Sequence, residues 1–127
     1  IGGKLLRVLC AEDDEPLALM IKFALETGGH QVERARDGLH ALEQMLDDLD
    51  RFDVLVTDHQ MPRLSGRELV ERVRRTAFSG KIIVHSSQLT ETDAAAYRAL
   101  AVDHIFTKPV ALGDFLDVVQ RIASVSP

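Results

Sequence analysis

The sequence predicts an α/β fold in which a parallel sheet lies between two layers of helices. Five short apolar runs alternate with five stretches whose apolar residues recur at helical spacing. Short, nearly unbroken apolar runs are typical of strands that are buried on both faces of a parallel sheet. Strict alternation with short connections predicts right-handed crossovers, and hence a three-layer, doubly wound arrangement.

The predicted strands are apolar runs that end on polar residues. They span residues 5–11, 31–35, 53–58, 81–84 and 102–107. The third strand must end near Asp58, because Pro62 cannot continue a hydrogen-bonded ladder. The second strand is short and alternates apolar with polar residues, which predicts a place nearer the edge of the sheet.

The predicted helices fill the intervals between the strands. The first has Pro16 in its first turn, where the missing N–H of proline costs nothing, and it ends at Gly28-Gly29. The fourth opens at Thr90, which together with Asp93 resembles a capping box, and it is rich in alanine. The apolar positions that predict the other helices are Leu17, Met20, Ile21, Ala24 and Leu25 in the first, Leu42, Met45, Leu46 and Leu49 in the second, Leu69, Val70 and Val73 in the third, and Leu112, Phe115, Leu116, Val119 and Ile122 in the last.

The length of 127 residues fits a single domain with one sheet. A barrel of eight strand–helix units would need roughly twice as many residues, so we expect the flavodoxin-like strand order 2-1-3-4-5. In that order the first and third strands are neighbours at the switch point, where ligands bind. The chain does not begin with Met, and its first residues resemble a cut edge, so residues 1–127 could be one domain of a longer protein.

Composition excludes several classes of function. A formal net charge of −5 argues against direct binding to nucleic acid or to an anionic membrane. The sequence contains neither an apolar run long enough to span a bilayer nor a signal-peptide pattern. Cys10 is the single cysteine and lies in an apolar run, so we expect a small core residue in a reducing, cytoplasmic compartment.

Side chains that can perform chemistry follow four of the five predicted strands. Glu12-Asp13 follow the first strand, Asp58 the third, Ser86 the fourth and Lys108 the fifth. Because these strand ends meet at one edge of the sheet, we expect the three carboxylates to converge in one crevice. Clustered carboxylates repel one another unless a cation such as Mg²⁺ neutralises them. An aspartate in line with a bound phosphoryl group can act as its nucleophile.

Each of these residues also has a simpler interpretation. The acidic residues after the first strand, and Asp14 above all, could cap the helix that follows. Ser86 alone could be a turn residue, and Lys108 alone a surface charge. The coincidence of an acid pair, an aspartate, a hydroxyl and a lysine at four strand ends favours a functional site.

The five histidines show no metal-ligand spacing. His85 and His104 are predicted to be strand or loop residues with satisfied hydrogen bonds. His59 follows Asp58 directly and could line the crevice.

The chain resembles the receiver domain of two-component response regulators, within the CheY-like superfamily, over essentially its whole length. Four motifs carry this resemblance, in order and at suitable spacing. They are the first strand with its acidic pair (residues 8–15), Asp58 to Pro62 followed by Gly66, residues 82–87 with Ser86, and Lys108-Pro109.

The resemblance implies a phosphorylation-activated switch. Asp58 would accept a phosphoryl group from a phosphohistidine on a histidine kinase or a histidine phosphotransfer protein. Glu12, Asp13, Asp58 and the backbone carbonyl of Gln60 would hold Mg²⁺. The domain would be a regulatory phosphoacceptor rather than an enzyme, assisting only its own phosphorylation and dephosphorylation.

The resemblance also implies how the signal is read. Lys108 would pair with the phosphoryl oxygens, and Ser86 would move to hydrogen-bond one of them. The output surface would comprise the fourth helix, the fifth strand and the fifth helix, roughly residues 91–124. A homodimer through this surface is one arrangement that the resemblance allows; the downstream effector is not indicated.

The sequence departs from the family pattern at Ile105 and Ser87. Ile105 stands three residues before Lys108, where the family often has an aromatic switch residue, and the neighbouring Phe106 is expected on the opposite face. Ser87 replaces a common alanine. Gln60 and Gln88 occupy the two positions that tune the lifetime of the phosphoaspartate in this family.

Two other functions remain open from the sequence. A Mg²⁺-dependent phosphohydrolase with an aspartyl nucleophile usually has a second acid two residues after the nucleophile, where this chain has Gln60. A receiver-like binding module without phosphorylation would be favoured by loss of Asp58, of an acidic residue or of Lys108, and all of these are present.

Overall fold

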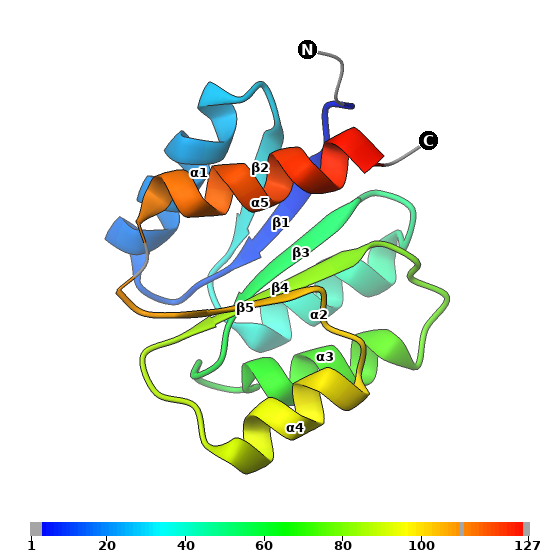
Figure 1. The fold of residues 1–127 in the computed structure, drawn as a ribbon. Coiled ribbons are helices and arrows are strands. Elements are labelled where there is room, and N and C mark those ends of the chain that lie inside the picture. Colours follow the sequence, from blue (N-terminus) through cyan, green and yellow to red (C-terminus); the bar gives the residue numbers. More distant parts are fainter. Residues whose placement is uncertain (1–3, 110, 126–127) are drawn as a thin grey trace.

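The chain forms one five-stranded parallel sheet, as the sequence predicts (Figure 1). A computed structural model describes residues 4–109 and 111–125. The strands are β1 (Arg7–Ala11), β2 (Gln31–Ala35), β3 (Val54–Asp58), β4 (Lys81–Ser86) and β5 (His104–Thr107). Their order in the sheet is β2-β1-β3-β4-β5, so β2 lies at an edge and β1 and β3 are neighbours.

Helices cover both faces of the sheet. They are α1 (Glu15–Thr27), α2 (Gly38–Asp47), α3 (Gly66–Arg74), α4 (Glu91–Ala99) and α5 (Leu112–Val125). Figure 1 shows α1 and α5 on one face, and α2, α3 and α4 on the other. The doubly wound, three-layer prediction is therefore confirmed. Among the helices of the described residues, none is both long and apolar enough to cross a membrane.

The core consists of two apolar clusters, one on each face of the sheet. Strand residues alternate between the faces, so that Leu55 joins the cluster under α2, α3 and α4 while Val54 and Val56 join the one under α1 and α5. Cys10 lies in the second cluster and is 1% exposed, as predicted. Burial raises the pKa of its thiol to about 12.

Side chains at the helix starts satisfy backbone N–H groups that would otherwise lack a partner. Thr90 caps α4 by accepting a hydrogen bond from the N–H of Asp93, whose carboxylate accepts from the Thr90 hydroxyl. The reciprocal capping box expected at this place is found instead at α3, between Ser65 and Glu68. The Asp37 carboxylate accepts from the N–H of His40 and caps α2.

Three strands begin later than predicted. Leu6 precedes β1 and donates its N–H to Nδ1 of His30. Asp103 precedes β5, and it is joined to Ile82 of β4 twice: its carboxylate accepts the N–H of Ile82, and its own N–H donates to the carbonyl of Ile82, both at 2.8 Å. β3 begins at Val54, one residue after its predicted start, and β4 continues two residues further than predicted, to Ser86.

Two helices bury fewer apolar residues than predicted. Met20 of α1 and Leu46 of α2 were expected on the core faces of their helices, but they are 51% and 57% exposed. α2 ends at Asp47, so Leu49 packs against the core from the loop that follows. The apolar stripe of a helix can be wider than the face that packs against the rest of the protein. The spacing of apolar residues alone does not reveal where that packed face ends.

Candidate functional site

The carboxyl ends of β1, β3 and β5 bring together two carboxylates and a lysine. Asp58, at the end of β3, is 7% exposed, and Glu12, directly after β1, is fully buried. Nζ of Lys108 lies 3.1 Å from Oδ2 of Asp58 and 3.9 Å from Oε1 of Glu12. The ammonium group of Lys108 thus neutralises part of the charge that the two buried acids concentrate at this edge.

Glu12 is held by its backbone and by one of its carboxylate oxygens. Its N–H donates to the carbonyl of Ala35 at 3.1 Å, and Oε2 accepts the N–H of Asp14 at 3.0 Å. Burial raises the pKa of the Glu12 carboxyl above its ordinary value, and the nearby Asp58 adds to the shift. The other oxygen, Oε1, has no hydrogen-bond partner among the described residues.

Asp13 lies on the same loop as Glu12 but is exposed. Arg34 fixes this loop by donating from Nε to the carbonyl of Glu12 and from Nη2 to the carbonyl of Asp13, at 3.1 and 3.2 Å. The ligand atoms that gather within 4.8 Å of one another come from Glu12, Asp58 and His85, without Asp13. Of the three carboxylates expected to converge, two therefore do so, and Asp13 stands at the outer margin.

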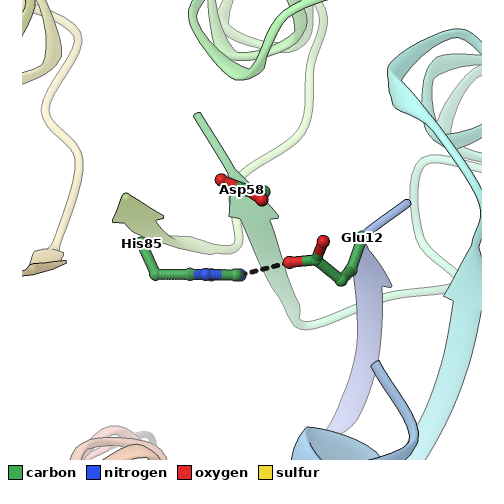
Figure 2. Close-up of side chains that lie close together, drawn as sticks. All are labelled: Glu12, Asp58 and His85. Atoms are coloured by element: carbon green, nitrogen blue, oxygen red, sulfur yellow. Dashed lines mark ion pairs between the residues drawn. The ribbon is translucent and has the colours of Figure 1, made fainter. Parts of the chain in front are cut away.

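His85 is the residue of this group that the sequence analysis did not select. It precedes Ser86 in β4, pairs in register with Asp58 of β3 and is 1% exposed. Figure 2 shows its ring edge directed at the Glu12 carboxylate, with Nε2 lying 3.5 Å from Oε1. Nε2 makes no hydrogen bond within the described part of the chain, so the expectation of satisfied hydrogen bonds for His85 was wrong. Burial lowers the pKa of the His85 imidazole, which is therefore neutral at pH 7.

The hydroxyl of Ser86 is turned toward its own loop. It donates to the carbonyl of Gln88 at 2.7 Å and accepts the N–H of Gln88 at 3.2 Å. Ser86 is buried, whereas the side chains of Ser87 and Gln88 are exposed. Ser87, His85 and Lys108 line a cleft of about 410 Å³ between the site and the start of α5.

The loop after β3 passes very close to the backbone of Asp58. A Cβ atom at Gly66 would collide with the carbonyl oxygen of Asp58, and Gly66 donates its N–H to the carbonyl of His59 at 2.8 Å. Glycine is therefore required here for close approach rather than for an unusual φ angle. The N–H of Gln60 lies 3.3 Å from Oδ1 of Asp58, while the Gln60 side chain points to solvent.

A polar chain links the residue after Asp58 to α4. Nδ1 of His59 lies 2.6 Å from the hydroxyl of Tyr97, and Nε2 lies 3.3 Å from Oδ2 of Asp93. Asp93 also pairs with Nη1 of Arg67 in α3, at 3.2 Å. Tyr97 is fully buried, and this burial raises the pKa of its phenol. Tyr97 gives no signal in the sequence, because one aromatic residue in an alanine-rich helix forms no periodic pattern.

Ile105 and Phe106 lie on opposite faces of the sheet, as predicted. Ile105 packs against the same apolar cluster as Tyr97. Phe106 packs against the cluster under α1 and α5, where its ring centroid is 4.7 Å from that of Phe115. The position three residues before Lys108 is therefore occupied by an aliphatic side chain that packs against the cluster containing Tyr97.

Comparison of the sequence with known protein families shows to which family the chain belongs. The family described as the response regulator receiver domain matches residues 8–120, almost the whole chain. This chain belongs to that family. Receiver domains are the regulatory, phosphorylation-activated part of two-component response regulators, and the resemblance inferred from the sequence is confirmed.

The most similar relatives include response regulators of mycobacteria. Response regulator MprA of Mycobacterium leprae is 33% identical over 117 residues, which cover 92% of this receiver domain and 50% of MprA. MprA of Mycobacterium tuberculosis (strain H37Ra) is 33% identical over 110 residues, covering 87% of this chain and 47% of MprA. The chain thus spans about half the length of the curated relatives that it matches.

Solved structures of receiver domains share the fold. The non-phosphorylated HemR receiver domain from Leptospira biflexa superimposes with a TM-score of 0.85 at 27% identity, covering 98% of each chain. The chemotaxis protein CheY4 of Vibrio cholerae has a TM-score of 0.83 at 26% identity and covers 94% of this chain and 99% of CheY4. The flavodoxin-like strand order and the CheY-like classification are both confirmed.

Proposed function

We propose that Asp58 is the phosphoacceptor of this receiver domain. The observation that carries the proposal is the pairing of Asp58 with Lys108 at 3.1 Å, beside the buried carboxylate of Glu12. Phosphoryl transfer depends mainly on positioning and on neutralising charge, and this constellation supplies both. Asp58 lies at the carboxyl end of β3, at the switch point of the sheet, where substrates of doubly wound folds bind.

In the proposed reaction, Asp58 acts as a nucleophile. One of its carboxylate oxygens forms a bond to phosphorus while the bond between phosphorus and the donor's imidazole nitrogen breaks, and the electron pair returns to that nitrogen. Lys108, which pairs with Asp58 at rest, would then pair with the phosphoryl oxygens that replace that contact. Ser86 would leave its hydrogen bond to the carbonyl of Gln88 and donate to a phosphoryl oxygen.

The residues at the site fit a divalent cation. Oε1 of Glu12 is a buried oxygen ligand without a hydrogen-bond partner in the described structure, and the charge of Asp58 lies beside it. We propose that Glu12, Asp13, Asp58 and the carbonyl of Gln60 hold Mg²⁺. When bound, the ion would neutralise the charge that builds up on the phosphoryl oxygens during transfer. The exposed position of Asp13 would leave it able to turn toward the ion.

The proposed output surface consists of α4, β5 and α5. The contact between His59 and Tyr97 supports a role for α4, because it joins the residue after Asp58 to a buried side chain of that helix. With Ile105 at the usual aromatic position, Tyr97 is our candidate for the residue whose packing reports the state of Asp58. Such a local change in charge would bias a bistable packing arrangement.

The proposed partners are a histidine kinase or a histidine phosphotransfer protein, and a downstream effector that reads α4, β5 and α5. We propose a cytoplasmic location, where such donors act. Neither alternative function has specific support. Gln60 stands where a phosphohydrolase would have its general acid. A binding module without phosphorylation could lack the acidic residues or Lys108, but this chain has them all. The exposed side chains of Gln60, Gln88 and Ser87 are proposed to tune the lifetime of the phosphoaspartate.

Beryllofluoride, which mimics a phosphoryl group on aspartate, tests the proposal without a kinase. We expect ¹H–¹⁵N spectra of the wild type to change at the ends of β3 and β4 and along α4 when beryllofluoride and Mg²⁺ are added together. Asp58→Asn should abolish the change, whereas the control Asp114→Asn, at an exposed acid in the first turn of α5, should retain it. An unchanged wild-type spectrum, or a full response in Asp58→Asn, would refute the proposal.

A further inference from the structure

His85 places a nitrogen ligand inside the acidic site. Its Nε2 is directed at Oε1 of Glu12, and Figure 2 shows both groups beside Asp58. The three side chains offer ligand atoms that all lie within 4.8 Å of one another, and each side chain is buried. The group therefore combines two carboxylate oxygens with one imidazole nitrogen.

The contact between His85 and Glu12 is not a satisfied hydrogen bond. The 3.5 Å between Nε2 and Oε1 exceeds ordinary hydrogen-bond lengths, and neither atom has another hydrogen-bond partner in the parts of the chain that the structure describes. A buried polar atom without a partner is unfavourable, because it has lost its hydrogen bonds to water. A cation between the two atoms would satisfy both, because ligands that share a metal ion at about 2.0–2.2 Å lie roughly 3–3.5 Å apart.

We propose that His85 is a ligand, with Glu12 and Asp58, of a divalent transition-metal ion such as Co²⁺ or Zn²⁺. Imidazole nitrogen suits such ions, whereas Mg²⁺ prefers oxygen ligands alone. The inference rests on the proposed function of the acidic site, since Glu12 and Asp58 serve both. It goes beyond that function by adding a ligand and a preference among metals.

The backbone and the ring of His85 are both held in place, which suits a metal ligand. Its backbone is fixed in β4, where it pairs with Asp58 and accepts the N–H of His59 at 3.0 Å. The ring packs edge-on against Phe115 of α5, with centroids 5.5 Å apart. Three protein ligands would leave coordination positions for water or for a phosphoryl oxygen. Lys108, whose side chain is 26% exposed, can move its ammonium group toward solvent as the ion enters.

The test compares metal affinities of the wild type with those of His85→Leu, which keeps the volume against Phe115 and removes the nitrogen. Affinities for Mg²⁺, Zn²⁺ and Co²⁺ are measured by calorimetry, and Co²⁺ is also followed by its visible absorption. We expect His85→Leu to weaken Zn²⁺ and Co²⁺ by about tenfold or more, a loss comparable to removing a partner of a metal ligand. Mg²⁺ affinity should change far less. His104→Gln, at a half-buried histidine of β5, is the matched control and should leave all three affinities unchanged.

A second measurement uses the unaltered protein and so does not depend on the folding of a variant. Zn²⁺ should shift the ¹⁵N resonance of His85 Nε2 strongly, and Mg²⁺ should not. Unchanged His85 resonances at saturating Zn²⁺, or equal Zn²⁺ affinities of wild type and His85→Leu, would overturn the inference. If beryllofluoride and Mg²⁺ still switch the wild type in that case, the proposed function stands and only the role of His85 falls.

Discussion

The hydroxyl of Tyr97 in α4 lies 2.6 Å from Nδ1 of His59, the residue that follows Asp58. This contact is the shortest polar route that the described structure offers from the end of β3 to α4. Both side chains are largely enclosed: Tyr97 is fully buried and the His59 side chain is 11% exposed. A change at Asp58 that moves His59 therefore acts directly on a buried group of the proposed output surface.

Tyr97→Phe tests this coupling by removing a single oxygen atom. We expect Asp58 to respond to beryllofluoride as before, while the accompanying shifts of α4 amides become much smaller. The free energy of unfolding should fall by about 1–2 kcal/mol, because Nδ1 of His59 loses its buried partner. The measurements are ¹H–¹⁵N spectra and urea unfolding. Full α4 shifts in the variant would show that the coupling takes another route.

Lys108→Met tests the pairing of the lysine with Asp58. Because the ammonium group competes with a metal ion for the same carboxylate, the variant should bind Mg²⁺ more tightly than the wild type. The α4 response to beryllofluoride should nevertheless be reduced, since the phosphoryl mimic loses its charged partner. Calorimetry and spectra report the two effects separately. Weaker Mg²⁺ binding in Lys108→Met would contradict the proposed competition.

Gly66→Ala should destabilise the fold by about 2 kcal/mol or more, because the new methyl group meets the Asp58 carbonyl in a packed interior. Gly113 provides a matched control. It lies in α5, and a Cβ atom there would meet nothing within 4 Å, so Gly113→Ala should stabilise by about 0.5–1 kcal/mol. Urea unfolding measures both. Equal effects at the two positions would refute the close-approach argument.

Glu12→Gln should remove a pH dependence of stability in metal-free protein. Burial raises the folded-state pKa of Glu12, so the folded protein keeps this proton at pH values where the unfolded chain has lost it. The stabilisation from this proton is complete below the ordinary glutamate pKa of about 4.3 and is lost as pH rises toward the raised value. Metal-free Glu12→Gln should therefore gain stability over the wild type as pH rises from 4 to 8, as urea midpoints would show. Parallel pH profiles would argue against the raised pKa.

Much of this architecture can be predicted from the sequence because strands and helices have different apolar periods. The buried run that ends at Asp58 and the strict alternation of elements define a parallel sheet, and its strand order places Glu12, Asp58 and Lys108 at one edge. These neighbours follow from topology alone. Side-chain contacts within the edge do not.

The position of His85 could have been predicted from the alternation of side chains along a strand. His85 lies two residues after Ile83, which shares its face of the sheet, and in-register pairing with β3 puts it beside Asp58. Asp13 could not be assigned in the same way, because it lies in a loop whose path depends on hydrogen bonds from Arg34. Tyr97 and His59 meet across two separate elements, a contact that depends on how α4 packs.

The most direct test of the account is phosphorylation by acetyl phosphate, read as intact mass. Wild-type protein is incubated with and without Mg²⁺, beside Asp58→Asn and the control Asp114→Asn. We predict a Mg²⁺-dependent gain of one phosphoryl group in the wild type and the control, and none in Asp58→Asn. A modification that persists in Asp58→Asn, or a wild type that neither acetyl phosphate nor a phosphorylated histidine kinase can modify, would contradict the assignment of Asp58 as the phosphoacceptor.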